Sequence, residues 1–440
     1  MSNAGSIVEQ THRLVRSVSG SCRPHVVYLR RKPGRGMVVR YATTDAASRS
    51  WTATVPDSVF EQRLEPFEDV IESGVPVVSG VTCVPFPCDP MLPALAAALD
   101  LSSQDASWRL LSAALRTVLD DPASVLVATT ARCVRYKPGE RCVLRYELEG
   151  LDRAGAVHRA SVYGKMFADR DDAIRTWDVA CRLHRASDRQ RPPVPRPLVP
   201  RPLVIDEAMS IVVTASAGVD ARSGIDVLSP PRACESDLTT TGELLAWLHS
   251  VTEKPAVGTR PMSALIDQTR RRAALLGTTH DALASELCRV ADAVITTLSG
   301  SGEPNITVLL HGAFKPSQLV FVAGHPVMTD LDGATFGDPA HDLGYLRAYL
   351  RPPGCWTRRA APRDWYAAAR AVVTTAYVDA FNRVIGVGVD RELCRRAVAV
   401  EAAVLFKIAA RRVNRLQAPR PTEVRAMLAD VERCLAEAGA

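Results

Sequence analysis

The amino-acid sequence predicts an α+β protein in which a strand-rich part precedes a larger helical part. Between residues 125 and 167, β-rich runs alternate with short turns, as in VLVATTARCVRY, KPGE and RCVLRYELEG. Beyond residue 228, apolar residues recur at three- and four-residue spacing, which is typical of amphipathic helices. The chain has 440 residues, 47% of them hydrophobic, and this length suits two or three domains.

The composition argues against several classes of protein. No apolar run is long enough to span a membrane, and the first residues show no stretch typical of a signal peptide. We therefore expect a soluble, cytoplasmic protein with no membrane partner. The eleven cysteines include no Cys-x-x-Cys pair, which argues against a zinc cluster or a disulfide framework. A net charge of +6 with few aromatic residues is weak support for nucleic acid, so no nucleic-acid partner is expected.

Three regions are predicted along the chain: an N-terminal extension at residues 1–105, a strand-rich domain at residues 106–215 and a helical domain at residues 216–440. The extension contains RKPGRGMVVRY at residues 31–41, which aligns with YKPGERCVLRY at residues 136–146. This similarity indicates a partial duplication of one hairpin, although two ordinary hairpins with a common turn would give the same pattern.

Helical patterns occur on both sides of the boundary at residue 216, and the first ones are an Ala/Leu-rich run after Pro93 and residues 107–119. Residues 169–185 form one predicted helix, on which Asp178 lies among apolar residues of the same face. The later helices are expected at residues 238–249, 262–276, 280–298, 365–384, 391–413 and 423–436. Lys407, Arg411, Arg412 and Arg415 make a basic helical face, which is either a solvated face or a partner-binding patch.

Residues 306–346 collect polar side chains at the ends of short predicted strands. An apolar run at residues 307–310 leads into a Gly/Pro-containing turn at residues 311–318, and two further strands flank a hairpin at residues 324–326. The polar side chains that follow these strands are those of His311, Lys315, Gln318, Asp330 and Asp332. Strand ends on a rigid scaffold can hold such groups in place, so this stretch is the predicted functional site.

This stretch resembles the catalytic and metal loops of the aminoglycoside phosphotransferase and choline kinase family, distant relatives of the protein kinases. The matching elements are His311-Gly312, Pro316, Asp330 at the metal-binding position, and GDPAHDLG at residues 337–344. The resemblance implies a bilobal, protein-kinase-like fold with a small β-rich N-lobe and a large helical C-lobe. The N-terminal extension with its duplicated hairpin would be an addition to that fold.

Two residues depart from the family pattern. Ala313 occupies the position of the catalytic Asp, which would accept the proton of the substrate hydroxyl, and Gln318 occupies the position of a metal-binding Asn. The change to Gln318 keeps an amide oxygen. Three accounts of Ala313 stay open: an engineered substitution, a natural one that makes the protein a pseudokinase, or a substitution compensated by another group such as Lys315.

The resemblance also implies roles for individual residues. The catalytic positions are Ala313, His311 and Lys315; the nucleotide-binding residues are Lys137, Gly139, Lys165, Asp178, Val213, Thr214 and Ala215; the metal ligands are Gln318, Asp330 and Asp332. Asp342 would brace the catalytic turn. The implied cofactors are ATP or GTP together with Mg²⁺, for which oxygen donors are the suitable ligands.

The leading functional hypothesis is an ATP- and magnesium-dependent phosphotransferase that transfers the γ-phosphate to a hydroxyl group of a small molecule or a peptide. Ala313 is expected to impair this reaction, because general-base assistance is worth roughly 10²–10⁴-fold in rate. The alternative is a pseudokinase, a nucleotide-binding module that regulates or scaffolds a protein partner. A scaffold without nucleotide is the third hypothesis. Acidic and basic residues balance in the helical half, which mildly disfavours polycationic aminoglycosides as acceptors.

Overall fold

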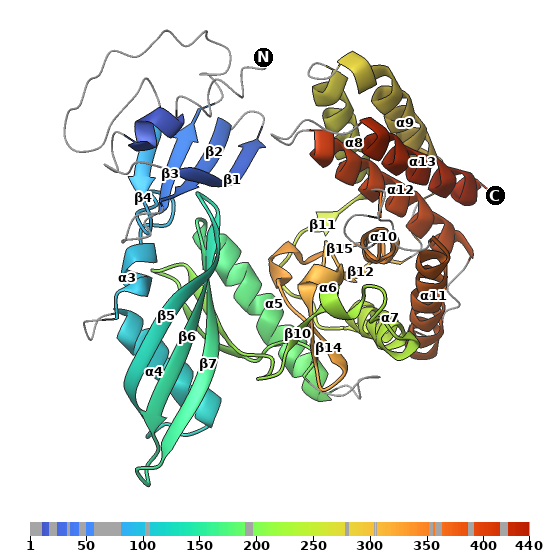
Figure 1. Ribbon diagram of the computed structural model, residues 1–440. Helices are drawn as coiled ribbons and strands as arrows, with labels where there is room; N and C mark the ends of the chain where they lie inside the picture. Colours follow the sequence, from blue (N-terminus) through green and yellow to red (C-terminus); the bar gives the residue numbers. More distant parts are fainter. Residues whose placement is uncertain are drawn as a thin grey trace. The chain divides into compact units, whose positions relative to one another are not determined.

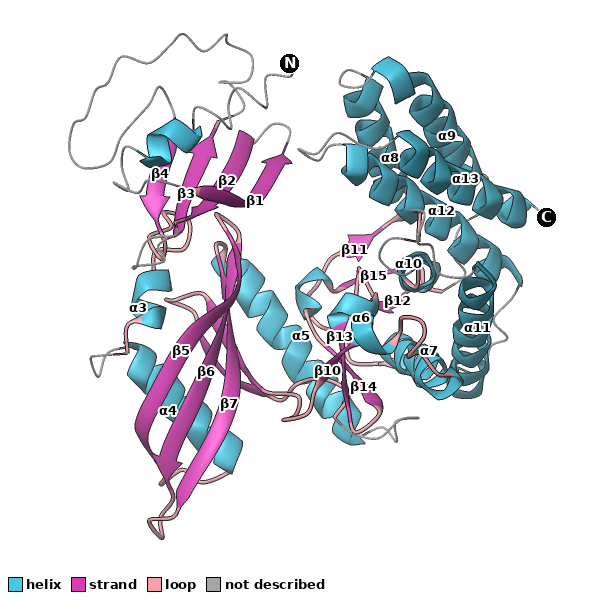
Figure 2. Ribbon diagram, in the orientation of Figure 1, coloured by secondary structure: helices cyan, strands magenta, loops and turns pink. Residues whose placement is uncertain are grey.

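The computed structural model (Figure 1) describes residues 11–16, 24–32, 36–43, 50–56, 81–101, 106–189, 197–277, 281–302, 304, 306–351, 355–356, 363–385, 391–413 and 421–439. It divides into two compact units. Unit 1 comprises residues 1–173 and 203–214, and unit 2 comprises residues 174–202 and 215–440. The predicted α+β class is confirmed: strands dominate unit 1 and helices dominate unit 2 (Figure 2).

Unit 1 contains two antiparallel arrangements of strands. The first sheet has the order β1-β2-β3-β4, with β1 His25–Lys32, β2 Gly36–Ala42, β3 Ser50–Val55 and β4 Thr82–Pro85. The second has the order β5-β6-β7-β9-β8, with β5 Val125–Lys137, β6 Arg141–Leu151, β7 Val157–Phe167, β8 Pro202–Asp206 and β9 Ile211–Ala215. Helix α3 is Leu95–Leu99, and α4, Ala106–Leu119, packs against β5, β6 and β7.

The two similar sequence segments occupy the same place in the two sheets of unit 1. Each includes the end of one strand and most of the next strand, β1 and β2 in one sheet and β5 and β6 in the other. Alternate residues are buried in the same phase, so Met37, Val39 and Tyr41 correspond to Cys142, Leu144 and Tyr146. This equivalence fits the predicted duplication of a hairpin, in which the inward-facing positions of a strand repeat every two residues.

Unit 2 carries most of the helices. They are α5 Arg170–Arg189, whose first turn belongs to unit 1, α6 Gly224–Val227, α7 Glu235–Ser250, α8 Met262–Gly277, α9 Asp281–Ser299, α10 Ala340–Tyr349, α11 Arg363–Ile385, α12 Arg391–Val413 and α13 Pro421–Gly439. Small sheets of order β10-β13-β14 and β11-β15-β12 lie between them. Their strands are β10 Arg222–Ser223, β11 Thr259–Arg260, β12 Val308–Leu310, β13 Leu319–Val322, β14 His325–Met328 and β15 Thr335–Gly337.

Helix α10 lies between two hydrophobic cores of unit 2. Leu343 and Leu346 join a core formed with α5, α7, α11 and the short strands, whereas Tyr345 and Ala348 join a core formed with α8, α9, α12 and α13. Nearly every α10 side chain is therefore buried, which explains why the apolar residues of this short helix do not form a single stripe. The polar residues that α10 does carry face protein groups instead of water.

The predicted helices correspond closely to the observed ones, whereas one predicted strand starts later than expected. The apolar run MSIVVTA at residues 209–215 predicts a strand over its whole length, but β9 begins at Ile211. Ser210 has a positive φ of 51° and belongs to the turn that joins β8 and β9. A backbone in that region ends an extended strand, so the apolar Met209 belongs to the turn. Arg415 of the predicted basic face lies outside the described residues.

Candidate functional site

The turn that follows β12 is held by one buried carboxylate. Asp342, in the first turn of α10, accepts hydrogen bonds from the backbone N–H groups of His311 at 2.5 Å, Gly312 at 3.3 Å and Phe314 at 3.3 Å. Its side chain is fully buried. A carboxylate that accepts several backbone N–H bonds fixes the path of the chain. The segment from residue 311 to residue 314 therefore has a defined position relative to α10.

Two histidines flank the same carboxylate. His249 Nε2 lies 3.6 Å from Asp342 Oδ2, and His341 Nδ1 lies 3.7 Å from Asp342 Oδ1. Burial acts to raise the pKa of Asp342, but the interactions with His249 and His341 outweigh burial and hold the pKa well below its usual range. His249 is oriented on its other side by Tyr377, whose hydroxyl lies 2.9 Å from Nδ1.

Gly312 is required by the geometry of this turn. Its φ of +79° belongs to the left-handed region, and a Cβ atom at this position would lie 2.1 Å from the carbonyl oxygen of Gly333. Arg260, at the end of β11, donates from Nη1 to the carbonyl oxygen of Gly312 at 2.7 Å. The turn after β12 and the loop that contains Gly333 are thus in direct contact.

The structure brings two of the predicted metal ligands together. Gln318 Nε2 donates to Asp330 Oδ2 at 2.8 Å, and Thr329 donates from both its backbone N–H and its hydroxyl to the carbonyl oxygen of Gln318. His311 Nε2 lies 2.9 Å from the carbonyl oxygen of Thr329. The loop that ends at Gln318 and the loop that contains Thr329 and Asp330 are therefore in direct contact through their polar groups.

Asp330 adopts an unusual backbone conformation. Its φ of 64° and ψ of 52° place it in the left-handed region immediately before the 3-10 turn Leu331–Gly333, which contains Asp332. Asp and Asn tolerate this region better than most residues, but the conformation still costs free energy. Gln318, the last residue of the 3-10 turn Pro316–Gln318, is buried with 8% of its surface exposed.

The oxygen donors present fit a magnesium ion better than a softer metal. Mg²⁺ in proteins is commonly bound by one or two carboxylates, with water and substrate phosphates as the remaining ligands. One carboxylate of Asp330 beside the amide of Gln318, with Asp332 two residues on, is such a set. Within the described part of the chain, no group of three His, Cys, Asp or Glu side chains is arranged to hold a metal, as a closed site of the zinc type would require.

Ala313 and Lys315 lie on the side of the turn that faces the second core of unit 2. Ala313 is half-buried and packs against that core, to which Tyr345 and Phe406 belong. Lys315 Nζ lies 5.1 Å from the centre of the Tyr349 ring, within the range of a cation–π contact. At residue 313 the turn therefore presents a methyl group toward this core.

The predicted nucleotide-binding residues other than Asp178 lie on β5, in the turn after it, and on β7 and β9. Lys165 is on β7 opposite Val143 of β6, and its ammonium group is 5.4 Å from the Phe167 ring. Lys137 is the last residue of β5, Gly139 lies in the following turn with φ +68°, and Val213, Thr214 and Ala215 end β9.

Asp89 was not predicted as part of any site, yet it holds the turn after β5. Its Oδ2 accepts hydrogen bonds from the backbone N–H of Gly139 at 2.8 Å and from the hydroxyl of Tyr136 at 2.7 Å. Arg40 lies over the Tyr136 ring at 5.2 Å. The N-terminal sheet and the β5–β6 turn are thus connected by polar and aromatic contacts within unit 1. No spacing rule indicates such contacts between residues about fifty positions apart.

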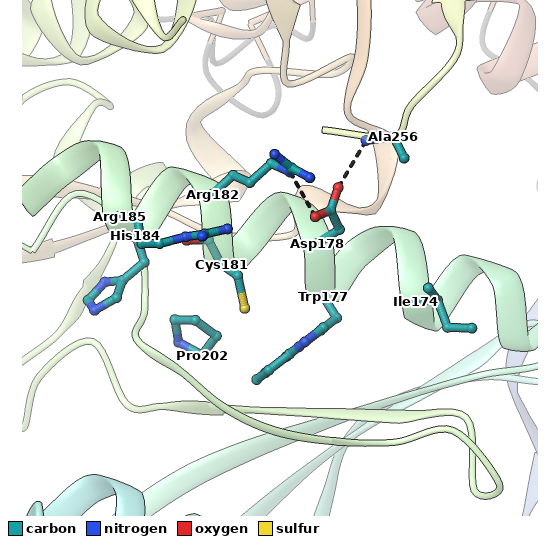
Figure 3. A pocket seen from close by; sticks show the side chains of 9 residues that line it. All are labelled: Ile174, Trp177, Asp178, Cys181, Arg182, His184, Arg185, Pro202 and Ala256. Atoms are coloured by element: carbon teal, nitrogen blue, oxygen red, sulfur yellow. Dashed lines mark hydrogen bonds and ion pairs between the residues drawn. The ribbon is translucent and has the colours of Figure 1, made fainter. Parts of the chain in front are cut away.

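Asp178 lies at a groove along α5 (Figure 3). One of its oxygens accepts from Arg182 Nε at 2.7 Å and the other from the backbone N–H of Ala256 at 2.9 Å. The groove has a volume of about 670 Å³ and is lined by Ile174, Trp177, Asp178, Cys181, Arg182, His184, Arg185, Pro202 and Ala256. Its walls are mostly apolar, and the Asp178 carboxylate is engaged by groups of unit 2. The predicted pairing of Asp178 with Lys165 stays a prediction.

Comparison with known proteins gives a family match over the middle of the chain. Residues 167–379 match the model of the Phosphotransferase enzyme family, APH. The family resemblance predicted from the sequence is confirmed by this match, and the α+β architecture agrees with the protein-kinase-like fold. The matched segment contains the turn after β12 and the residues of the Gln318–Asp330 contact. It begins after Lys165.

Several solved structures are similar to this chain. A choline/ethanolamine kinase family protein from Mesorhizobium loti has 16% identity, a TM-score of 0.43, and coverage of 66% of this chain and 84% of that one. A spectinomycin phosphotransferase in complex with ADP and spectinomycin has 11% identity, a TM-score of 0.43, and coverage of 71% and 92%. A glucosamine kinase has 17% identity, a TM-score of 0.44, and coverage of 94% and 92%. No curated protein sequence matches the chain.

No helix in the described ranges combines the length and the apolar character that a membrane span requires. The ten described cysteines are all free thiols, and the eleventh, Cys22, lies outside the described residues.

Proposed function

We propose that this protein is a magnesium- and ATP-dependent phosphotransferase that transfers the γ-phosphoryl group to a hydroxyl group. The contact that carries the proposal is the one between Gln318 Nε2 and Asp330 Oδ2 at 2.8 Å. It joins the two family positions that would hold the metal, next to a turn fixed by Asp342. Phosphoryl transfer depends chiefly on positioning and on compensation of phosphate charge, and this arrangement suits both requirements.

Asp330 and Gln318 would hold Mg²⁺, with Asp332 as a further ligand. The bound ion would neutralise charge on the phosphate oxygens. The left-handed backbone at Asp330 supports this role, because a strained residue is retained where its side chain has a task that other positions cannot perform. His311 would orient the loop through the carbonyl of Thr329, and Asp342 would brace the turn.

Unit 1 would bind the nucleotide. Lys165 would hold the α- and β-phosphates, Lys137 and Gly139 would form part of the loop over the phosphates, and backbone groups of residues 213–215 would meet the adenine edge. Asp178 would act as the acidic partner of the strand lysine. Residues 106–215 and 216–440 would then act as N-lobe and C-lobe, with residues 1–105 as an extension.

Ala313 limits the rate that this site can reach. Its methyl group cannot accept the proton of an attacking hydroxyl, and loss of such assistance costs roughly 10²–10⁴-fold in rate. Lys315 is close enough in sequence to contact the transferred phosphate, but a protonated ammonium group is no base. We therefore infer slow transfer in the sequence as it stands, with metal and nucleotide binding retained.

A second candidate function is a catalytically silent, nucleotide-binding module that regulates or scaffolds a partner protein. The observation that favours this function is Ala313 itself, since the half-buried methyl group packs against the core and leaves no carboxylate at that point of the turn. Both candidates require Mg-ATP binding, and they differ in turnover.

Calorimetric titration with Mg-ATP, followed by measurement of ADP release with and without hydroxyl acceptors, tests the proposal. We expect binding by the unchanged chain, slow turnover, and a rise of roughly 10²–10⁴-fold in the Ala313→Asp variant. Ala154→Asp places the same charge in an exposed turn of unit 1 and serves as the control. Binding without turnover in both the unchanged chain and the Ala313→Asp variant supports the silent module, and absence of Mg-ATP binding overturns both functions.

A further inference from the structure

Basic side chains from three elements of unit 2 gather around a pair of tyrosines. Tyr345 and Tyr349 stack along α10 with ring centres 6.2 Å apart. The surrounding cations are Arg260 at the end of β11, Arg272 on α8, and Lys407 and Arg411 one helical turn apart on α12. We call these six residues the cation–tyrosine cluster. Its elements are in contact, because α12 packs against both α8 and α10, and β11 leads directly into α8.

Lys407 is the central cation of the cluster. Its Nζ donates to the hydroxyl of Tyr345 at 2.6 Å and lies 4.7 Å from the centre of that ring. Burial lowers the pKa of Lys407 well below its usual value, and the nearby charges of Arg411, Arg272, Lys315 and Arg260 lower it further. The ammonium group is thus held among like charges, which disfavours its protonated form.

In the part of the chain that the structure describes, the cations of the cluster lack the acidic partners that other inward-facing arginines have. Arg347 and Arg351 bind the buried carboxylate of Glu401 at 2.8 and 2.9 Å, and Arg396 binds Asp338 at 2.7 Å. Among the described residues, no carboxylate forms an ion pair with Arg260, Arg272, Lys407 or Arg411. Arg272 also has a buried Nη1 atom without a hydrogen-bond partner there.

Such an arrangement is costly in the absence of a ligand. Partly desolvated charges of one sign repel one another, and proteins normally offset that cost with acidic side chains, as Glu401 does in the neighbouring network. Arginine and lysine groups that converge without acids are typical of sites for phosphate-bearing ligands. A dianion that accepts hydrogen bonds from the guanidinium and ammonium groups would supply the missing charge.

We propose that the cation–tyrosine cluster binds a phosphate monoester and that the physiological acceptor of this protein is a hydroxyl compound that already carries such a group. The cluster adjoins the candidate catalytic turn, because Arg260 donates to the carbonyl of Gly312 and Ala313 packs against the core that contains Tyr345. A ligand anchored there by its phosphate would present its hydroxyl groups toward residue 313. The tyrosine faces suit the apolar side of a sugar or polyol.

The assignment of this ligand as the acceptor rests on the proposed function, whereas the binding of a phosphate monoester does not. Calorimetric titration of the full chain with glucose 6-phosphate, without ATP, tests binding directly. Glucose, glucuronate and glucosamine at the same concentrations probe a neutral, a singly anionic and a cationic ligand of similar shape. We expect glucose 6-phosphate to bind at least about tenfold more tightly than the others, with an affinity that falls as salt is added.

Substitutions locate the binding. Arg411→Met, at an exposed position on α12, and Lys407→Met should each weaken glucose 6-phosphate binding about tenfold or more. Matched controls are Arg412→Met, since Arg412 is the next residue and pairs with Glu423 at 3.7 Å, and Arg270→Met on α8, since Arg270 pairs with Asp267 at 2.8 Å. Both controls should keep the affinity of the unchanged chain. If Lys407→Met disturbs folding, the affinity of Arg411→Met for glucose 6-phosphate alone decides whether the ligand binds at the cluster.

Saturating Mg-ADP separates the cluster from a nucleotide site. If glucose 6-phosphate binds equally well in the presence of Mg-ADP, its site is distinct from the nucleotide site. If that binding is lost in Arg411→Met, the site is the cation–tyrosine cluster. Equal affinity for glucose and glucose 6-phosphate, or binding unchanged in Arg411→Met, overturns the inference even if the protein phosphorylates a neutral alcohol. Cluster-dependent binding of glucose 6-phosphate by a chain that fails to bind Mg-ATP overturns the proposed function and leaves the anion site standing.

Discussion

The carboxylate of Asp342 accepts the backbone N–H of His311 at 2.5 Å across a separation of 31 residues. This bond makes the candidate catalytic turn part of the packing of α10 rather than a free loop. Because α10 contributes side chains to both cores of unit 2, the position of the turn depends on the integrity of each core. The turn is therefore expected to be as rigid as the helix that holds it.

Replacing Asp342 by Asn should destabilise unit 2. The amide has one acceptor oxygen and no charge, so bonds from the backbone of His311, Gly312 and Phe314 are lost or weakened at a fully buried position. A loss of about 3 kcal/mol in the free energy of unfolding is expected for bonds to a buried charged group. Thermal unfolding followed by circular dichroism measures it. Asp267→Asn, at an exposed residue of α8, is the control, and equal unfolding midpoints for the two variants would contradict the bracing role.

Asp330→Asn should remove magnesium-dependent nucleotide binding while preserving the fold. Asn tolerates the left-handed backbone of residue 330 nearly as well as Asp, so the loop should keep its shape and only the charge is lost. The measurement is the affinity for ATP with Mg²⁺ and with EDTA. We expect the difference between the two conditions to shrink at least about tenfold in the variant, since a charge-assisted ligand is removed. Asp332→Asn, two residues on, shows whether the second carboxylate contributes. An unaltered magnesium effect in Asp330→Asn would exclude residue 330 as the ligand.

Much of the fold follows from patterns that are local in sequence. The helices and hairpins have regular apolar periodicities, and the loops that carry Gln318 and Asp330 are only twelve residues apart, so a motif can place both near one site. Neither feature requires knowledge of distant contacts. The family resemblance carried by residues 311–344 could be recognised for the same reason, because its elements lie in one continuous stretch.

Contacts between distant segments could not be predicted in this way. Asp89 reaches Gly139 and Tyr136 from a region with no recognisable spacing rule. The face of α12 that bears Lys407 and Arg411 is an instructive case. A helical row of basic residues has the same pattern whether it faces water or an aromatic pair on another helix, and only the contact of Lys407 with Tyr345 distinguishes the two environments.

Cys133 is expected to be a reactive thiol of unit 1. Its Sγ lies 3.7 Å from that of Cys142, and this hydrogen bond, opposed by burial and aided by the charge of Arg40, lowers the pKa of Cys133 to about 7. Burial raises the pKa of Cys83 to about 12. Only the thiolate reacts with iodoacetamide, and mass spectrometry across a pH series measures the extent of alkylation. The labelling of Cys133 should have its midpoint near pH 7, and Cys83 should stay unlabelled below pH 9.

Cys142→Ala provides the matched test of the cause. Without the neighbouring thiol, the thiolate of Cys133 loses its hydrogen bond, and the midpoint of labelling should move to higher pH. An unchanged midpoint would show that the reactivity of Cys133 has another origin.

Glu401 should make unit 2 sensitive to acid. Burial acts to raise the pKa of Glu401, but Arg347, Arg351 and Arg370 outweigh it and lower the pKa from 4.5 to about 2. A carboxyl group whose pKa is lower in the folded state stabilises the protein fully above its unfolded pKa. That contribution is lost as the pH falls from about 5 toward 2, and the shift corresponds to about 3 kcal/mol. Unfolding by urea at a series of pH values should show this loss, and Glu401→Gln should lack it.

The Glu401→Gln variant should also be less stable than the unchanged chain at pH 7. The variant removes the fully buried carboxylate that Arg347, Arg351 and Arg370 share and leaves them with the outer acidic partners Glu437 and Asp430. Breaking a buried ion pair typically costs about 3–5 kcal/mol. Glu432→Gln is the control, because Glu432 forms an exposed pair with Arg289 on the surface of α13. Subtracting the Glu432→Gln curve from the Glu401→Gln curve removes the contribution of other carboxyl groups such as Asp342. If the difference in unfolding free energy between the two variants stays constant between pH 5 and pH 2, the acid sensitivity does not come from Glu401. If this difference becomes smaller as the pH falls, the acid sensitivity is assigned to Glu401.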